Sequence, residues 1–178
     1  MHAYSHYYVL SASGKNSVSK LNILLNPFAG FGCNIIKSKM AVMGNEIIAN
    51  ILLGGNWGAM AKLESAIPKL EVSSKFKISL AKTEYLEELV FYQTYTLEVN
   101  SLDKIGSLSK LINFLKTHKI MIHEISTGSY LAQNKTPMLH MSLKIDIPES
   151  VQIIRFRDEL SDYSEVANLD TYLEICKN

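Results

Sequence analysis

Residues Thr94 to Glu124 read TYTLEV-NSLDKIG-SLSKLINFLKTHK-IMIHE, and their pattern indicates the fold of the whole chain. Apolar and polar residues alternate over 94–99, which predicts a strand with one buried face. The next apolar residues fall at i, i+3, i+4 and i+7, the spacing of one stripe on an amphipathic helix: Leu108, Leu111, Ile112 and Leu115. Between strand and helix, Asp103 and Gly106 supply turn chemistry. The stretch is therefore a strand, a short polar loop, a helix and a second strand.

The same arrangement occurs once more, near the start of the chain. A short strand over 6–10 leads into a polar loop over 14–17. A helical stripe follows that loop: Val18, Leu21, Leu24, Leu25 and Phe28. The stripe runs into Gly32-Cys33-Asn34-Ile35, where the next strand begins. We therefore interpret the chain as a duplicated unit.

Two registers relate the repeats. Placing Asn16 over Asp103 aligns both loops, both helices and both following strands without a gap. A rival register, shifted by three residues, pairs SVSKL at 17–21 with SLSKL at 107–111. Three residues is close to one helical turn, so the apolar stripe fits either register. The first is preferred because it keeps the strands before and after the helix in phase.

The rest of the first repeat predicts a hairpin, a second helix and a fourth strand. Gly44-Asn45 is the expected hairpin turn, and Asn56 is well placed to cap the second helix. Pro68 is expected to end or kink that helix near its last turn. The three strands are expected over 35–43, 46–53 and 76–80.

The second repeat follows the same order. Its hairpin pairs roughly 120–126 with 138–147 around a looser segment at 130–137. Pro148 ends the second of these strands, and Ser150 is a candidate cap for the helix that follows. That helix and the last strand are expected over 153–163 and 169–175.

The predicted fold class is α+β. Each repeat has the order βαββαβ of ferredoxin-like domains, an antiparallel sheet with helices on one face. We expect two such domains in tandem. Their predicted bounds are 1–83 for the first domain, 84–89 for a linker and 90–178 for the second domain.

Composition excludes several classes of function. The formal net charge of +1 over 178 residues argues against a nucleic-acid binder driven by electrostatics, and only Arg155 and Arg157 are arginines. Two cysteines, Cys33 and Cys176, are too few for a disulfide framework, which favours a reduced, intracellular protein. The N-terminus lacks the pattern of a secretion signal, and no apolar run is long enough to span a bilayer. A cytoplasmic protein is expected.

Two tandem units with a polar loop after each first strand resemble ACT domains, which are small amino-acid-binding regulatory modules. The chain resembles one family in particular, the glycine cleavage system transcriptional repressors. The matching segments are GCNI at 32–35, SKMAVMGNE at 38–46, LLGGNW at 52–57, and Leu63-Glu64 with Pro68. The resemblance implies a regulator that responds to glycine or a similar small amino acid. It also implies action on an activator protein of the LysR type, without direct binding to DNA.

The first loop departs from this family. Where family members carry Asp-Arg-Pro-Gly, the aligned residues are Asn16, Ser17, Val18 and Ser19. The change removes an acidic partner for an amino group, and it places a side chain where bare backbone would approach a ligand. The second loop keeps Asp103, and Gly106 occupies the glycine position of the wider ACT pattern.

An amino-acid site needs amides for the carboxylate and an oxygen acceptor for the ammonium group. Two sets of residues fit in type: Asp103, Gly106 and Ser107 in the second unit, and Asn16, Ser17 and Asn34 in the first. The alternative is that these residues only form turns and helix caps. Because Asp103 alone adds a full negative charge, binding is expected to depend more on it than on Asn16.

Catalytic, metal and cofactor sites are not expected. His123 and His140 lie on paired strands, but two histidines without a third ligand do not indicate a metal site. Cys33 has no neighbour in the sequence that would activate it, so we expect a small buried thiol. Three alternatives remain: a small ferredoxin-like enzyme, an RNA-binding module, and an ACT pair that has lost ligand binding. Unpaired edge strands lead us to expect a homo-oligomer.

Overall fold

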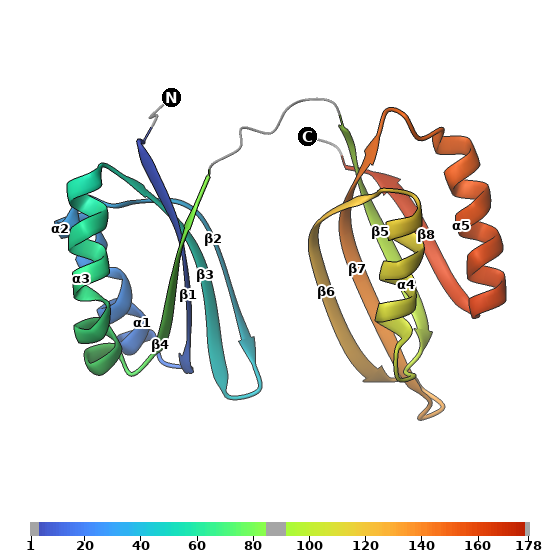
Figure 1. Cartoon of the computed structure of the whole chain (residues 1–178). Helices are drawn as coiled ribbons and strands as arrows, with labels where there is room; N and C mark the ends of the chain where they lie inside the picture. The colour runs from blue at the N-terminus through green and yellow to red at the C-terminus, as the bar shows by residue number, and fades with distance from the viewer. Residues whose placement is uncertain (1–3, 85–91, 177–178) are drawn as a thin grey trace. The chain divides into compact units, whose positions relative to one another are not determined.

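The computed structural model describes residues 4–84 and 92–176 (Figure 1). The chain divides into two compact units, Met1–Glu87 and Glu88–Asn178. The predicted linker at 84–89 lies, apart from Glu84, outside the described residues.

The first unit is a four-stranded antiparallel sheet with strand order β2-β3-β1-β4. Its elements are, in chain order, β1 (His6–Lys15), α1 (Val18–Leu25), α2 (Pro27–Phe31), β2 (Asn34–Met43), β3 (Glu46–Gly55), α3 (Trp57–Ser74) and β4 (Lys77–Thr83). The edge positions therefore belong to β2 and β4.

The second unit has the corresponding strand order, β6-β7-β5-β8, and its sheet is also antiparallel. Its elements are β5 (Tyr92–Leu102), α4 (Ser107–Thr117), β6 (Met121–Leu131), β7 (Pro137–Pro148), α5 (Ile153–Ala167) and β8 (Leu169–Ile175). The predicted fold class, two tandem units of ferredoxin-like βαββαβ order, is confirmed.

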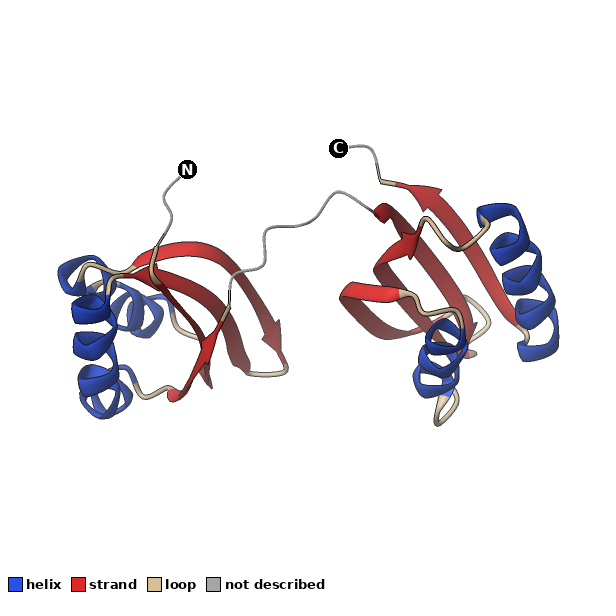
Figure 2. Ribbon diagram, turned by 45° about the horizontal axis from the view of Figure 1, so that its top comes forward, coloured by secondary structure: helices blue, strands red, loops and turns tan. Residues whose placement is uncertain are grey.

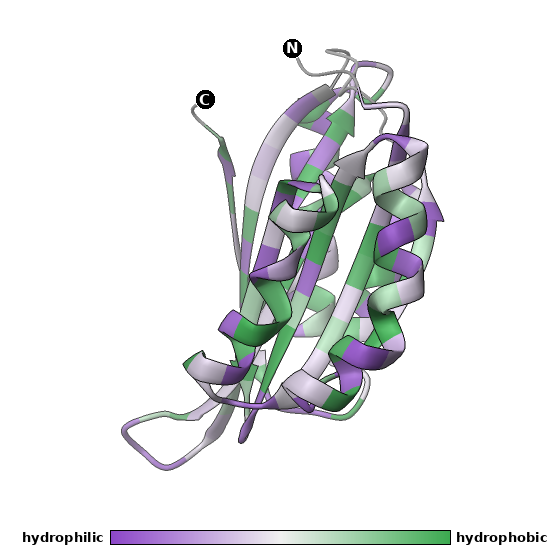
Figure 3. Cartoon of the chain, turned by 90° about the vertical axis from the view of Figure 1, so that its left-hand side faces the viewer, coloured by the Kyte–Doolittle hydropathy of each residue, from purple (hydrophilic) through white to green (hydrophobic). Residues whose placement is uncertain are grey.

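In each unit the helices lie on one face of the sheet, and the other face carries no helix of the same unit (Figures 1 and 2). The core fills the space between sheet and helices, because every second strand residue points towards the helices. In β5 these are Tyr95, Leu97 and Val99, all buried. Figure 3 shows apolar (green) bands interspersed with white and purple ones along both the strands and the helices.

Buried positions in the two units favour the register that places Asn16 over Asp103. Pairs of residues with that same spacing are buried in both units: Leu10 with Leu97, Leu24 with Leu111, Phe28 with Leu115, and Cys33 with Ile120. The edge strands β2 and β6 also carry an irregularity in equivalent places, between Ile35 and Lys37 in β2 and between Ile122 and Glu124 in β6. The duplication thus extends to the bulge residues, Ile36 and His123.

Several strands are longer than their side-chain patterns predict. β1 continues to Lys15, so it includes Gly14, which we expected in the loop. A Cβ at Gly14 would come within 3.1 Å of the Lys75 carbonyl oxygen and the Phe76 ring. The strand therefore passes too close to the residues just before β4 to leave room for a side chain. Backbone ladders need no side-chain alternation, which is why pairing extends past the predicted ends.

Two helix ends differ from the expectations. Pro68 does not end α3: it lies inside the helix, which continues to Ser74, and Leu70 in the following turn is buried in the core. Ser150 does not cap α5; the residue at that position is Gln152, and its side chain makes no capping bond. The expected cap at Asn56 is confirmed, since its Oδ1 accepts a hydrogen bond from the Ala59 amide at 2.9 Å.

Candidate functional site

The loop between β5 and α4 holds three of the predicted site residues. Asp103 follows the end of β5, where its amide donates to the Pro137 carbonyl at 3.0 Å, and its side chain is exposed. Gly106 has φ +86°, a left-handed conformation that disfavours any residue with a Cβ. It directly precedes α4, so the loop turns into the helix at the glycine predicted from the sequence.

Ser107 already uses its donors within the loop. Its amide donates to the Lys104 carbonyl at 3.2 Å and its hydroxyl donates to the same oxygen at 2.9 Å. The next two amides, of Leu108 and Ser109, belong to the first helical turn and have no preceding helical carbonyl to bind. An anion at this end of α4 would therefore meet those two amides before it met Ser107.

The equivalent loop of the first unit is shorter. The Asn16 amide donates to the Asn45 carbonyl at 3.1 Å, as the Asp103 amide does to Pro137. Ser17 is the residue that precedes α1, with extended backbone at φ −159° and ψ 118°, and its side chain makes no capping bond. Two residues thus make a connection for which the second unit uses four, and no left-handed glycine is needed.

Asn34 lies at the other end of the sheet from Asn16 and Ser17. It pairs with Gly54 in β3, and Gly54 in turn pairs with Tyr7 near the start of β1. Nine residues of extended chain separate Tyr7 from Asn16, about 30 Å at ~3.3 Å per residue. Within one unit, the structure does not bring Asn34 to the loop.

Residues 6–80 match the family model of the ACT domain. The match covers nearly all of the first unit, which is therefore similar to an ACT domain. The second unit has the same strand order and the same placement of helices on its sheet, so the chain carries the ACT arrangement twice.

The chain is similar to the glycine cleavage system transcriptional repressor of Escherichia coli (strain K12), with 24% identity over 146 residues, 82% of this chain and 77% of that protein. The repressor of Shigella flexneri matches to the same extent. Among solved structures, one proposed to be a glycine cleavage system transcriptional repressor superposes with a TM-score of 0.78 at 20% identity, over 97% of this chain and 98% of that one. A protein from Galdieria sulphuraria gives 0.75 at 20% identity, over 97% and 99%.

The helix-free face of the second ACT-like sheet holds a polar network that the sequence did not predict. Glu98 of β5 accepts a hydrogen bond from the Ser142 hydroxyl through Oε1 at 2.6 Å. Its buried Oε2 has no hydrogen bond but lies 3.2 Å from His140 Nε2. The other ring nitrogen of His140, Nδ1, lies 3.0 Å from Asn100 Oδ1. The register of β5 with β7 pairs Glu98 with Ser142 and Asn100 with His140. The cluster could therefore have been predicted only if that register had been known.

His123 has a separate carboxylate partner at the other end of the same sheet. Its Nε2 lies 2.5 Å from Oδ2 of Asp146, and the Thr94 hydroxyl donates to Oδ1 at 2.7 Å. Asp146 is 5% exposed, so both of its oxygens find partners inside the protein. His123 and His140 therefore belong to different clusters and do not form a pair.

In residues 4–84 and 92–176, no three histidine, cysteine, aspartate or glutamate side chains lie close enough to share a metal ion. Cys33 is buried, and its Sγ lies 3.6 Å from the Ala59 carbonyl oxygen, as expected for a structural thiol. None of the helices in these residues is both long enough and apolar enough to cross a membrane.

Proposed function

We propose that the chain is an amino-acid-responsive regulator of glycine cleavage genes that acts through contact with a LysR-type activator protein in the cytoplasm. The observation that carries this proposal is the extent of the similarity. It covers 82% of the chain in sequence against repressors of that system, and the fold covers 97%. Both ACT-like units are therefore included, as a regulator built from two such units requires.

The proposed ligand is glycine or a similar small amino acid, held at the loop that precedes α4. The Asp103 carboxylate is exposed and supplies the acceptor for an ammonium group. The amides of Leu108 and Ser109 at the start of α4 supply donors for a carboxylate. Asn16 and Ser17 offer the same types of group in the first unit without a full charge.

The mechanism we propose is linkage. A ligand that binds one arrangement of the protein more tightly shifts the population towards it, and a partner that prefers that arrangement then binds more tightly as well. Catalysis is not needed for this, and neither is DNA binding by the regulator itself. The near-neutral charge of +1 supports a partner that is a protein rather than a duplex.

The test measures binding of the full chain to its cognate LysR-type activator, by interferometry, with and without millimolar glycine. We expect the affinity to change with glycine, and we expect no binding of promoter DNA by the chain alone at physiological salt. Asp103→Ala should weaken the glycine response by roughly ten- to a hundredfold, and Asn16→Ala should do so less. Sequence-selective DNA binding by the chain alone would contradict the proposal.

A second candidate is a tandem ACT protein that contacts the activator without a ligand. It is favoured by Ser107, whose amide and hydroxyl both donate hydrogen bonds to the Lys104 carbonyl oxygen and are therefore not available to a ligand. It is also favoured by the first loop, which has neither an acid nor a left-handed glycine. Activator binding that is equally tight with and without glycine would support this candidate over the first.

A further inference from the structure

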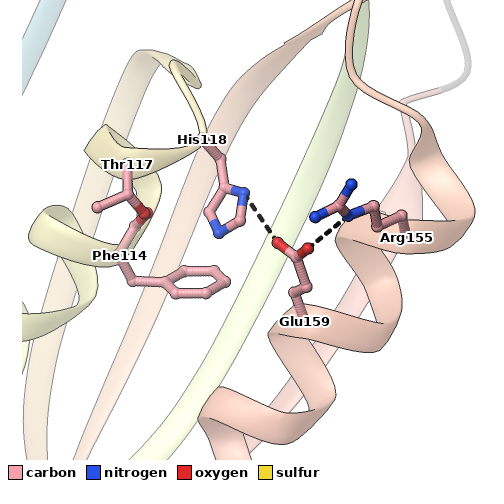
Figure 4. A network of polar contacts seen from close by, with 5 residues as sticks. All are labelled: Phe114, Thr117, His118, Arg155 and Glu159. Atoms are coloured by element: carbon pink, nitrogen blue, oxygen red, sulfur yellow. Dashed lines mark hydrogen bonds and ion pairs between the residues drawn. The ribbon is translucent and has the colours of Figure 1, made fainter.

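A cluster of three polar side chains lies in the second unit, where α4 ends and α5 begins (Figure 4). Arg155 Nε donates to Glu159 Oε1 at 2.7 Å, and His118 Nδ1 lies 3.3 Å from Glu159 Oε2. The hydrogen bond from Arg155 is the main cause that lowers the pKa of Glu159. A carboxylate is thus held in place between two nitrogen-bearing groups.

The cluster borders a hollow of about 360 Å³, whose other walls are Ser150, Val151, Gln152 and Phe156. This volume lies at the lower end of the range of small-molecule sites. The His118 ring is fixed, with its centroid 4.6 Å from that of Phe114 and 5.4 Å from that of Phe156. The hollow therefore has a rigid aromatic side next to the polar groups.

Arg155 has most of its donors left for a ligand. Of the five N–H groups of a guanidinium, the contact with Glu159 uses the one on Nε, and four remain on the terminal nitrogens. The Arg155 side chain is 78% exposed, so those nitrogens can meet a carboxylate in the bidentate manner typical of arginine.

Apart from the Glu159 carboxylate beside it, the location of Arg155 is unfavourable for a cation. It stands in the first turn of α5, where the helix dipole is positive and opposes a cation. That turn contains no acidic residue, and Gln152 provides no side-chain cap. A carboxylate bound beside Arg155 would oppose both the guanidinium charge and the positive end of the dipole.

The first unit serves as an internal comparison, because it has the same fold without the cluster. Its α3 aligns with α5 through two buried pairs, Ala59 with Phe156 and Leu63 with Leu160. On this alignment Gly58 and Lys62 stand where α5 has its arginine and glutamate, and Phe31 stands in place of the histidine. The start of α3 is instead closed by the Asn56 side chain. The fold does not require the cluster, so its presence in the second unit needs another reason.

We propose that this hollow binds a small zwitterion, an α-amino acid, with Arg155 holding its carboxylate and Glu159 its ammonium group. A bare anion is a poorer match because the Glu159 carboxylate would repel it. The ligand's side chain would lie against Val151 and Phe156. This inference rests on the proposed function, because it assigns the same class of ligand, a small amino acid, to a second binding site. The two places are distinct: Asp103 precedes α4 and His118 follows it, about 16 Å away at ~1.5 Å per residue.

The experiment is calorimetric titration of the full chain with glycine, L-alanine and L-serine, and with acetate and ethylamine as the separate halves of the zwitterion. We expect Arg155→Gln and Glu159→Gln each to weaken amino-acid binding by roughly ten- to a hundredfold. Arg157→Gln is the matched control, because it removes the same charge from the same helix turn but lines a different hollow. It should leave the affinity unchanged, and acetate and ethylamine should bind far more weakly than glycine.

Three outcomes would overturn the inference. If Arg155→Gln binds as the natural chain does while Asp103→Ala does not, the ligand lies at the loop before α4 and the proposed function stands. If acetate binds as tightly as glycine, the hollow is an anion site and not a zwitterion site. If no amino acid binds at all, the hollow has no such ligand, and activator binding without glycine then decides the proposed function. Circular dichroism of each variant verifies that it is folded.

Discussion

At the scale of single residues, Glu159 shows how neighbours set a carboxyl group's titration. The Arg155 hydrogen bond, followed by the charges of Arg155 and His118, lowers its pKa below the ordinary 4.5 despite some desolvation. A carboxyl whose pKa is lower in the folded chain stabilises the fold above its unfolded pKa. It loses that effect as the pH falls through the folded value. NMR titration of the Glu159 carboxyl carbon should give a midpoint below 4.5, which Arg155→Gln raises and Arg157→Gln leaves in place. Equal midpoints in all three proteins would contradict this prediction.

The two cysteines should differ in reactivity. Burial raises the pKa of Cys33 above its usual 9.0, and the residue is 7% exposed. Cys176 is only partly buried, with its Sγ 3.2 Å from the Thr96 hydroxyl. Because the thiolate is the reactive form, Cys33 should react with a thiol reagent at pH 8 at least roughly tenfold more slowly than Cys176. A fast phase that persists in Cys176→Ser would show that Cys33 is accessible.

At the scale of secondary-structure elements, the N-termini of the helices differ in whether a side chain caps them. The Asn56 side chain accepts from the Ala59 amide at 2.9 Å, whereas Ser17 makes no equivalent bond before α1. Asn56→Ala should therefore lower the free energy of unfolding of the first unit by about 1 kcal/mol. Ser17→Ala should change it by less than ~0.5 kcal/mol. Urea denaturation followed by the fluorescence of Trp57, the chain's single tryptophan, measures both. Equal losses would mean that the cap bond contributes nothing specific.

At the scale of the whole molecule, the edge strands make self-association the expected state. β2 pairs on one side only and is exposed along nearly all of its length, with Val42 54% and Met43 61% exposed. Such an edge tends to be covered by another chain. Sedimentation at micromolar concentration should show a dimer or larger species, and Val42→Lys should shift it towards monomer. Val166→Lys, on the exposed face of α5, is the control and should not. A natural chain that sediments as a monomer would make the predicted homo-oligomer wrong.

The element order, the duplication and several local features could be predicted from the amino-acid sequence. Alternation in 94–99, the helical stripe after Gly106 and the cap at Asn56 each depend on residues within a few positions of one another. The final strand has the predicted bounds, Leu169–Ile175, for the same reason. The register between the repeats is preferred from the phase of the strands, and burial in the structure supports it, because equivalent positions fill the two cores.

Which polar residues come into contact depends on how distant parts of the chain pack together. Glu98 and His140 come into contact because the register of β5 with β7 pairs Glu98 with Ser142 and Asn100 with His140. That register is a pairing over forty residues of chain that no local pattern specifies. In the first unit, the registers of β1 with β3 and of β2 with β3 place Asn34 at the end of the sheet away from Asn16. His118 reaches Glu159 only because α4 and α5 pack on the same face of one sheet, so their distant ends become neighbours.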